Sequence, residues 1–100
     1  MHTQFRSYRL AVDFHRQCRS LTLPDYLKDQ LVRASSSVAI NLAEGSGRST
    51  QRDQLRFFHM AFGSVRECQA ALDLAPRPHP ELIAAADSLA AHVYRLCYRR

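Results

Sequence analysis

Residues 27–45 read LKDQLVRASSSVAINLAEG, and a helical repeat runs through them from end to end. Apolar or small residues return at alternating steps of four and three, which is the spacing of a helix face packed against partner helices. A second apolar set on the opposite side predicts that the latter half of this helix is buried on two sides, at the centre of a bundle or of a subunit interface. The first set is Leu27, Leu31, Ala34, Val38, Asn41 and Gly45, and the second is Val32, Ala39, Ile40 and Ala43.

Turn-forming residues set the limits of this helix. The segment 22–25, Thr-Leu-Pro-Asp, supplies a hydroxyl N-cap, a proline in the first turn and a carboxylate three residues after the cap. The segment 45–47, Gly-Ser-Gly, is expected to end the helix, because glycine takes the left-handed conformation of a C-terminal cap without steric cost. Thr50 and Asp53 then form a start resembling a capping box for the next helix.

Three other segments carry helical spacing, and none reads as a strand. Residues 75–80, APRPHP, hold three alternate prolines and are expected to form an extended connector, with Pro80 in the first turn of the last helix. The sequence therefore predicts one all-α domain over residues 1–100, an antiparallel four-helix bundle with helices at about 4–20, 24–44, 51–74 and 80–98. The expected buried faces are Phe5, Tyr8, Val12 and Cys18 with Ala11 beside them in the first helix, Leu55, Phe58, Phe62, Val65, Cys68 or Gln69, and Leu72 in the third, and Leu82, Ala86, Leu89, Val93 and Leu96 in the fourth.

The composition narrows the classes of partner. The net charge is +5, and 13 of the 14 basic residues are arginine, whose planar fork grips phosphate in two places. This favours nucleic acid or an acidic protein as the partner, although a basic surface can also simply keep a small protein soluble. Three scattered cysteines without a secretory signal favour a cytoplasmic, reduced protein, and no apolar run is long enough to span a membrane.

No catalytic or metal site is predicted. The serines at 35–37 have no base beside them in the sequence, and the glycines at 45 and 47 lack the lysine and the strand of a phosphate-binding loop. His15 and Cys18 share a helical face, but a closed zinc site needs four ligands. We therefore expect a non-enzymatic protein without a cofactor or a metal.

Arginines are the strongest candidates for a binding surface. Arg52 and Arg56 share a helical face with His59, and Arg48 precedes that helix, so a phosphate there would meet guanidinium groups and free amide groups together. The alternative is an ordinary solvated helix face after a glycine turn. The predicted nucleic-acid-binding residues are Arg6, Arg9, Arg16, Arg48, Arg52 and Arg56.

A second group of polar residues is given a structural role. Glu44 is expected at a helix C-terminus, where exposed carbonyl groups disfavour another negative charge, so it needs a cationic partner, and Arg48 is the nearest. We predict that Asn41, Glu44, Gly45 and Arg48 lie at the bundle or subunit interface.

Residues 30–48, QLVRASSSVAINLAEGSGR, resemble the signature of one family, and residues 58–64, FHMAFGS, are similar to that family's third helix. This is the four helix bundle protein family, which includes proteins encoded in intervening sequences of bacterial large-subunit ribosomal RNA genes. It is related to accessory variability proteins of diversity-generating retroelements. The resemblance covers nearly the whole chain, although a short fourth helix and the proline-rich connector depart from the family pattern.

The resemblance implies a homopentameric, barrel-like assembly with a basic surface and, in the retroelement relatives, a role in binding nucleic acid and a reverse transcriptase. Our hypothesis from the sequence is a non-enzymatic, homo-oligomeric accessory protein that holds RNA or DNA on an arginine-rich surface and assists a reverse transcriptase. The alternative is a protein-protein interaction scaffold that docks an acidic partner.

Overall fold

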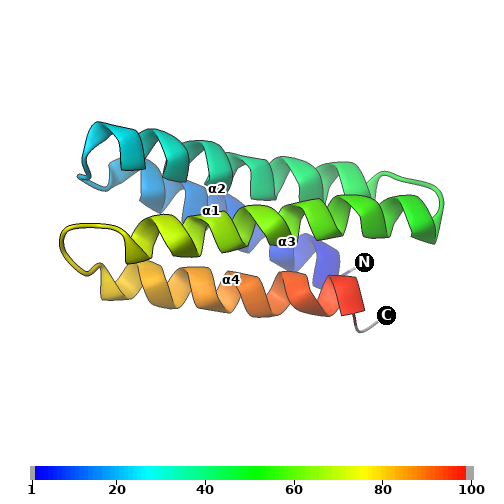
Figure 1. Cartoon of the computed structure of the whole chain (residues 1–100). Coiled ribbons are helices and arrows are strands. Elements are labelled where there is room, and N and C mark those ends of the chain that lie inside the picture. The colour runs from blue at the N-terminus through cyan, green and yellow to red at the C-terminus, as the bar shows by residue number, and fades with distance from the viewer. Residues whose placement is uncertain (1, 99–100) are drawn as a thin grey trace.

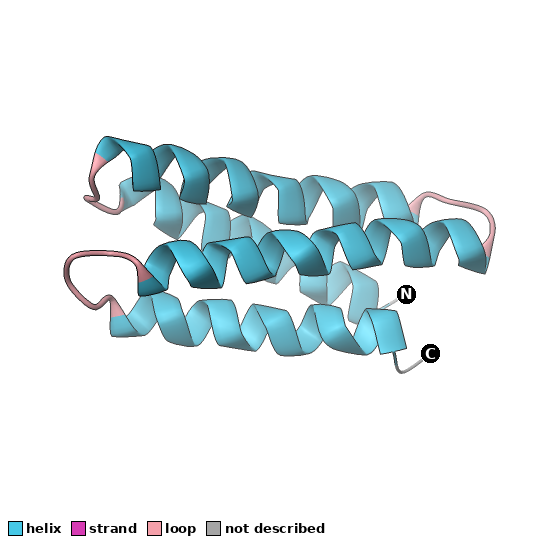
Figure 2. Cartoon of the chain, in the orientation of Figure 1, coloured by secondary structure: helices cyan, strands magenta, loops and turns pink. Residues whose placement is uncertain are grey.

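Four α-helices account for most of residues 2–98, which are the residues that the computed structural model describes. They are α1 (His2–Ser20), α2 (Asp25–Ser46), α3 (Gln51–Asp73) and α4 (Pro80–Tyr98), and no strand occurs among these residues (Figure 2). Each helix packs against two neighbours, in the order α1, α2, α3, α4 and back to α1, so the bundle runs up, down, up and down (Figure 1). No helix in this part of the chain is long and apolar enough to cross a membrane.

The core confirms most of the predicted seams. All five predicted residues of α4 are buried, and α3 buries Cys68 rather than Gln69 at the position that the sequence left open. In α2 the predicted seam is buried except at Asn41, which is half-buried, and in α3 Leu55 and Phe62 are half-buried. The buried residues are Ser7, Ala11, Phe14 and Cys18 in α1, Leu27, Leu31, Ala34, Ser35, Val38, Leu42 and Gly45 in α2, Phe57, Phe58, Ala61, Ser64, Val65, Cys68, Ala71 and Leu72 in α3, and Leu82, Ala86, Leu89, Ala90, Val93, Leu96 and Cys97 in α4.

The predicted core face of α1 was wrong for its largest residues. Phe5 is 60% exposed, Tyr8 is also exposed, and Val12 is half-buried. The buried positions 7, 11, 14 and 18 keep an unbroken spacing of four, three and four, whereas the spacing of 5, 8 and 12 leads next to polar residues at 15 and 16. The face with the unbroken repeat, which includes Phe14, enters the core, and Phe5 and Tyr8 are left outside.

The expectation that α2 is buried on two sides does not hold within one chain. Ile40 is 61% exposed and Ala43 is exposed, while Val32 and Ala39 are half-buried. The bundle covers only the side of α2 that faces α1 and α3. The outer side of its second half stays apolar and uncovered.

The helix starts follow the sequence signals at two of three places. Thr50 Oγ1 accepts a hydrogen bond from the Asp53 backbone amide at 3.1 Å, as predicted for α3, and α4 begins at Pro80. Thr22 is not the cap of α2. The N-cap is Pro24, which has a ψ of 143° and whose carbonyl oxygen accepts from the amides of residues 27 and 28 (3.0 and 2.9 Å).

Gly45 acts through its lack of a side chain and not through a left-handed backbone. The helix continues to Ser46, Gly47 caps it with a φ of −88°, and no positive φ occurs among the described residues. A Cβ atom on Gly45 would lie 2.6 Å from Phe58 Cε1 and 3.2 Å from Phe57 Cβ. The predicted left-handed cap is therefore wrong, and the glycine is needed because α2 and α3 approach each other closely here.

Small polar side chains continue this contact between α2 and α3. Ser64 Oγ donates to Ser37 Oγ at 2.9 Å. The amide nitrogen of Asn41 donates to the Ser37 carbonyl oxygen at 2.9 Å and lies 3.0 Å from the Ser37 hydroxyl. Their small volume lets the helices pack closely, and their hydrogen bonds satisfy polar groups that the contact covers.

The contact between α1 and α2 contains a histidine. His15 Nδ1 lies 2.7 Å from Ser35 Oγ, and that hydroxyl donates to the Val32 carbonyl oxygen at 3.1 Å. Because the hydroxyl has one proton, Ser35 accepts from His15, which must carry a hydrogen on Nδ1. Burial, helped by the nearby charges of Arg19 and Arg16, lowers the pKa of His15.

The three cysteines are free and buried. Burial raises the pKa of Cys18 to about 12 and the pKa of Cys68 to about 12. Both thiols therefore stay protonated and act as small apolar core residues.

Replacing Gly45 tests the close approach of α2 and α3. We expect Gly45→Ala to lower the free energy of unfolding by about 1–3 kcal/mol, because Phe58 is fully buried and cannot move away from the added methyl group. The matched control is Gly63→Ala, since a Cβ atom there would meet nothing within 4 Å, and it should raise stability by about 0.5–1 kcal/mol. Urea unfolding of both variants measures this, and equal stabilities would contradict the packing described.

His15 should make stability depend on pH. Its pKa is lower in the folded chain than in the unfolded chain, so the unfolded state takes up the proton first as the pH falls. The free energy of unfolding should therefore decrease as the pH falls below about 6.5, the ordinary pKa of histidine. His15→Asn keeps a donor toward Ser35 but cannot titrate, so urea unfolding should show a smaller decrease in that variant. Superimposable pH profiles would refute the assignment.

Candidate nucleic-acid interface

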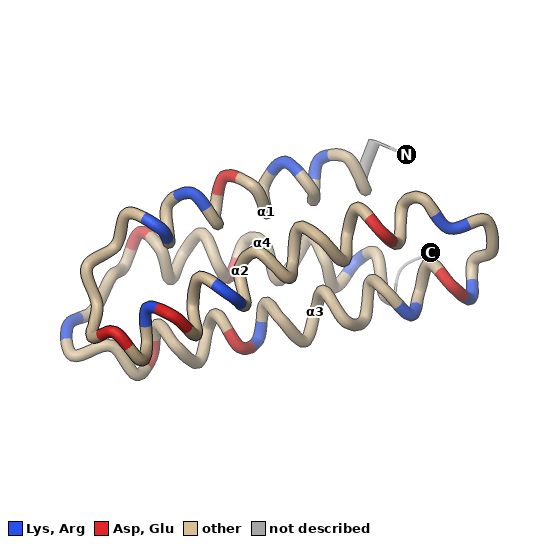
Figure 3. The backbone as a smooth tube through the Cα atoms, turned by 90° about the horizontal axis from the view of Figure 1, so that it is seen from above, with Lys and Arg blue, Asp and Glu red and all other residues tan. Residues whose placement is uncertain are grey.

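Charge is distributed unevenly along the bundle. Because the helices are antiparallel, residues 2–11, 36–62 and 89–98 share one half of the molecule, which we call the basic end (Figure 3). The basic end contains six arginines and two carboxylates, which gives it a net charge of +4. The other half, residues 12–35 and 63–88, contains six basic and seven acidic residues, which gives it a net charge of −1. The arginines are Arg6, Arg9, Arg48, Arg52, Arg56 and Arg95, and the carboxylates are Glu44 and Asp53.

The hairpin of α2 and α3 projects beyond α1 and α4 at the basic end (Figure 1). Near its tip the guanidinium carbons of Arg48 and Arg56 lie 4.7 and 4.4 Å from the centre of the Phe57 ring. Phe57 is only 9% exposed, and its Cβ atom lies close to Gly45 of α2. The ring therefore holds two cations at defined places on the projecting tip.

Sequence reasoning missed Phe57, because it lies beside the regular seam of α3 and not in it. The available signal was its position directly after Arg56. An aromatic residue next to an arginine in the sequence, nearly two turns from the helix start, predicts a cation–π contact only weakly.

Glu44 and Arg48 form an ion pair at 2.8 Å, with both side chains partly exposed. Such an exposed pair one helical turn apart contributes about 0.3–0.5 kcal/mol, so it orients Arg48 without withholding it from a phosphate. Asn41 does not join this pair, since it bonds to Ser37 on α2 itself. Within residues 2–98 this is the one ion pair, so Arg52 and Arg56 reach the solvent without a carboxylate partner.

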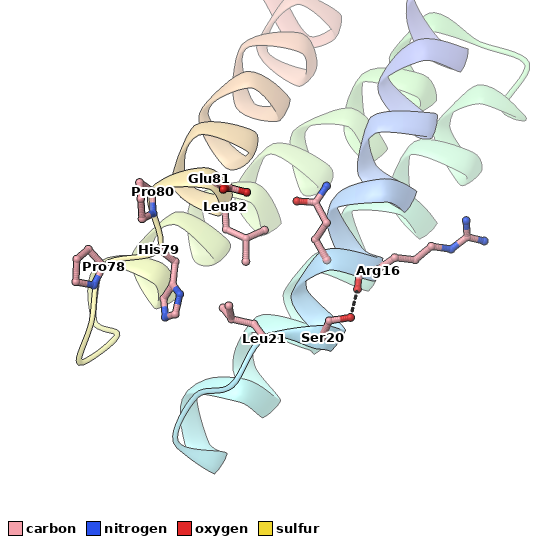
Figure 4. A pocket seen from close by; sticks show the side chains of 9 residues that line it. Arg16, Ser20, Leu21, Pro78, His79, Pro80, Glu81 and Leu82 are labelled. Carbon is pink, nitrogen blue, oxygen red and sulfur yellow. Dashed lines mark hydrogen bonds between the residues drawn. The ribbon is translucent and has the colours of Figure 1, made fainter.

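The arginines of α1 do not lie together. Arg6 and Arg9 are exposed at the basic end, and the Arg9 guanidinium lies 5.9 Å from the Phe5 ring centre. Arg16 is in the other half, where it lines a cleft of about 610 Å³ between the end of α1 and the proline-rich connector (Figure 4). Five of the six predicted binding arginines thus share one end, and Arg16 is separate from them.

The start of α3 is less suited to a phosphate than the sequence indicated. Thr50 Oγ1 already accepts the Asp53 amide, and the Asp53 carboxylate occupies the first turn. A negative side chain there competes with an incoming anion for the helix N-terminus. At this end the guanidinium groups, rather than the backbone amides, are the groups left open to an anion.

The buried Ser35 has a histidine beside it, although no base lies near it in the sequence. Ser35 contacts His15, which is the kind of base that activates a serine nucleophile, but Ser35 is completely buried and its hydroxyl donates to a backbone carbonyl. A substrate could not reach it. No group of three or more metal-ligating side chains occurs within the described part of the chain.

A family model described as 23S rRNA-intervening sequence protein matches residues 3–80. The match spans α1, α2, α3 and the connector, and it ends at the first residue of α4. No curated protein and no solved structure matches the chain.

Proposed function

The chain belongs to the family of 23S rRNA-intervening sequence proteins, and we propose that it acts there as a non-enzymatic, homo-oligomeric nucleic-acid-binding protein. The observation that carries this proposal is the basic end, where six arginines and two carboxylates give a net charge of +4. Guanidinium groups bind phosphate oxygens through paired hydrogen bonds. The proposed ligand is therefore the sugar-phosphate backbone of RNA or DNA.

The shape of the tip supports contact with a backbone rather than with base edges. Arg52 and Arg56 are exposed on a hairpin that stands clear of α1 and α4 (Figure 1), and Phe57 restrains Arg56. Backbone contacts position a protein on a nucleic acid without reading its sequence. Binding should be independent of sequence and should weaken with salt.

The apolar outer face of α1 and α2 supports self-association. Phe5 and Tyr8 of α1 and Ile40 and Ala43 of α2 are exposed, and a shallow groove of about 240 Å³ lies between the two helices. A chain of this size has a limited core, and a second copy is the partner that would cover this face in every molecule. We propose that this face is the subunit interface of a homo-oligomer, with five subunits expected from the family resemblance.

An acidic protein is the second candidate partner, because arginines on an aromatic ring are also typical of protein interfaces. A pull-down from nuclease-treated lysate separates the two proposals. Recovery of one defined acidic protein, lost with Arg52→Glu and Arg56→Glu, would favour a scaffold. Recovery of a reverse transcriptase would support the proposed retroelement role.

Charge reversal at the tip should weaken nucleic-acid binding. We expect Arg52→Glu with Arg56→Glu to lower affinity for a labelled RNA, because two phosphate contacts become repulsive. The slope of log K against log salt, measured between about 50 and 200 mM, should become shallower by about 1–2.

The matched control is charge reversal at the opposite end. Arg77→Glu with Arg19→Glu changes the net charge equally, but both residues are exposed in the half with excess carboxylates. These changes should lower affinity much less than the changes at the tip. An equal loss from both pairs would mean that only net charge matters and would contradict a site at the basic end.

A charge on the outer face of α2 should break the assembly. Ile40→Glu places a carboxylate at the proposed subunit contact, so light scattering coupled to size exclusion should show a shift toward the 11.4 kDa monomer. Tyr26→Glu is the control, because Tyr26 is at least as exposed as Ile40 and lies in the first turn of α2, where a carboxylate is tolerated. An unchanged mass for Ile40→Glu would rule out this face as the interface.

A further inference from the structure

Four aromatic rings form a continuous row across α3 and α4. His59 meets Tyr98 edge-on at 5.1 Å between ring centres, Tyr98 lies 4.6 Å from Tyr94, and Tyr94 meets Phe62 at 5.9 Å. All four residues fall within the basic end. We call them the aromatic row.

The fold does not need most of this row. Tyr94 is 48% exposed, Tyr98 is 56% exposed and His59 is exposed, whereas only Phe62 packs against the core. The buried face of α4 is supplied by Leu89, Val93 and Leu96. Large rings that leave half their surface in water, one turn apart, form an apolar platform at the surface.

Cations flank the row along α3. Arg52, Arg56 and His59 follow at steps of four and three, so they share an outward face, and Arg66 lies one turn beyond Phe62. All three arginines are exposed. The carboxylate on this side of α4, Asp87, lies two turns from Tyr94 and accepts a hydrogen bond from Gln69 at 2.9 Å. Phosphate-binding groups therefore stand at both ends of the rings.

We propose that the aromatic row is a stacking platform for unpaired bases, so that the ligand of the basic end is a single-stranded nucleic acid. This rests on the proposed function and names the class of its ligand. Every base has a flat face that stacks on an aromatic ring, and a positively charged surface beside the rings carries the backbone. A duplex keeps its bases stacked inside and offers only its phosphates.

The test compares a single-stranded oligonucleotide of about 12 nucleotides with a duplex of the same length and with a base-free sugar-phosphate chain. Tyr94→Ala with Tyr98→Ala should lower the affinity for the single strand about tenfold or more. Affinities for the duplex and for the base-free chain should not change. Tyr94→Phe with Tyr98→Phe keeps the rings and should bind like the unaltered protein.

Two further variants keep this result separate from the proposed function. Arg52→Glu with Arg56→Glu should weaken all three ligands, and Tyr26→Ala, an exposed tyrosine outside the row, should weaken none. If the tyrosine-to-alanine variant binds the single strand normally while the arginine-to-glutamate variant does not, the stacking platform is refuted and the proposed binding at the basic end is retained. If no ligand binds the unaltered protein, both proposals fall.

Self-association through the row is the competing explanation. Light scattering of Tyr94→Ala with Tyr98→Ala should show the subunit number of the unaltered protein. Loss of the assembly in that variant would show that the row is a subunit contact and would overturn the proposal.

Discussion

The close approach of α2 to α3 at Gly45 is the contact on which the rest of the molecule depends. It allows Phe57 and Phe58 to pack directly against the α2 backbone, and Ser37 and Ser64 extend the contact toward the middle of the bundle. A hairpin held at this separation can stand beyond α1 and α4 without a third helix to support it (Figure 1). The position of the tip arginines follows from this packing, because Phe57 is the ring on which two of them rest.

The bundle places three distinct surfaces at different positions on a chain of only 100 residues. The apolar face of α1 and α2 includes Phe5 and Ile40, the aromatic row lies on α3 and α4, and the arginines of the tip lie between them at one end. Since α1 and α2 are on the other side of the bundle from the row, one surface can be covered by another subunit while the other stays open. The architecture thus places the proposed subunit interface on α1 and α2 and the proposed base-stacking row on α3 and α4.

The sequence predicted the four helices closely, because apolar spacing and prolines report on local structure. The limits of α4 and the capping of α3 by Thr50 were both read from such signals. The core face of α1 was not predicted correctly. Both the face with Phe5 and Tyr8 and the face with Ala11 and Phe14 have helical spacing, and only packing against α2 and α4 decides which one is buried. Gly45 was assigned to a turn for the same reason: the side chain that forbids a Cβ atom there is Phe58, which is distant in the sequence.

The candidate site was predicted in composition but not in arrangement. The arginines at 48, 52 and 56 were identified from their spacing, yet their contact with Phe57 and the exposed pair Tyr94 and Tyr98 depend on which side of each helix faces water. Arg16 lies in the other half from Arg6 and Arg9, because seven residues, about 10 Å of helix, separate it from Arg9 along α1. The opposite charges of the two halves, over a length of 42 Å, give the bundle an electric dipole along its axis. Near a polyanion such a molecule would experience a torque as well as an attraction, and its arginine-bearing tip would turn toward the polyanion before the two touch, so that a larger share of collisions would bring the tip into contact first.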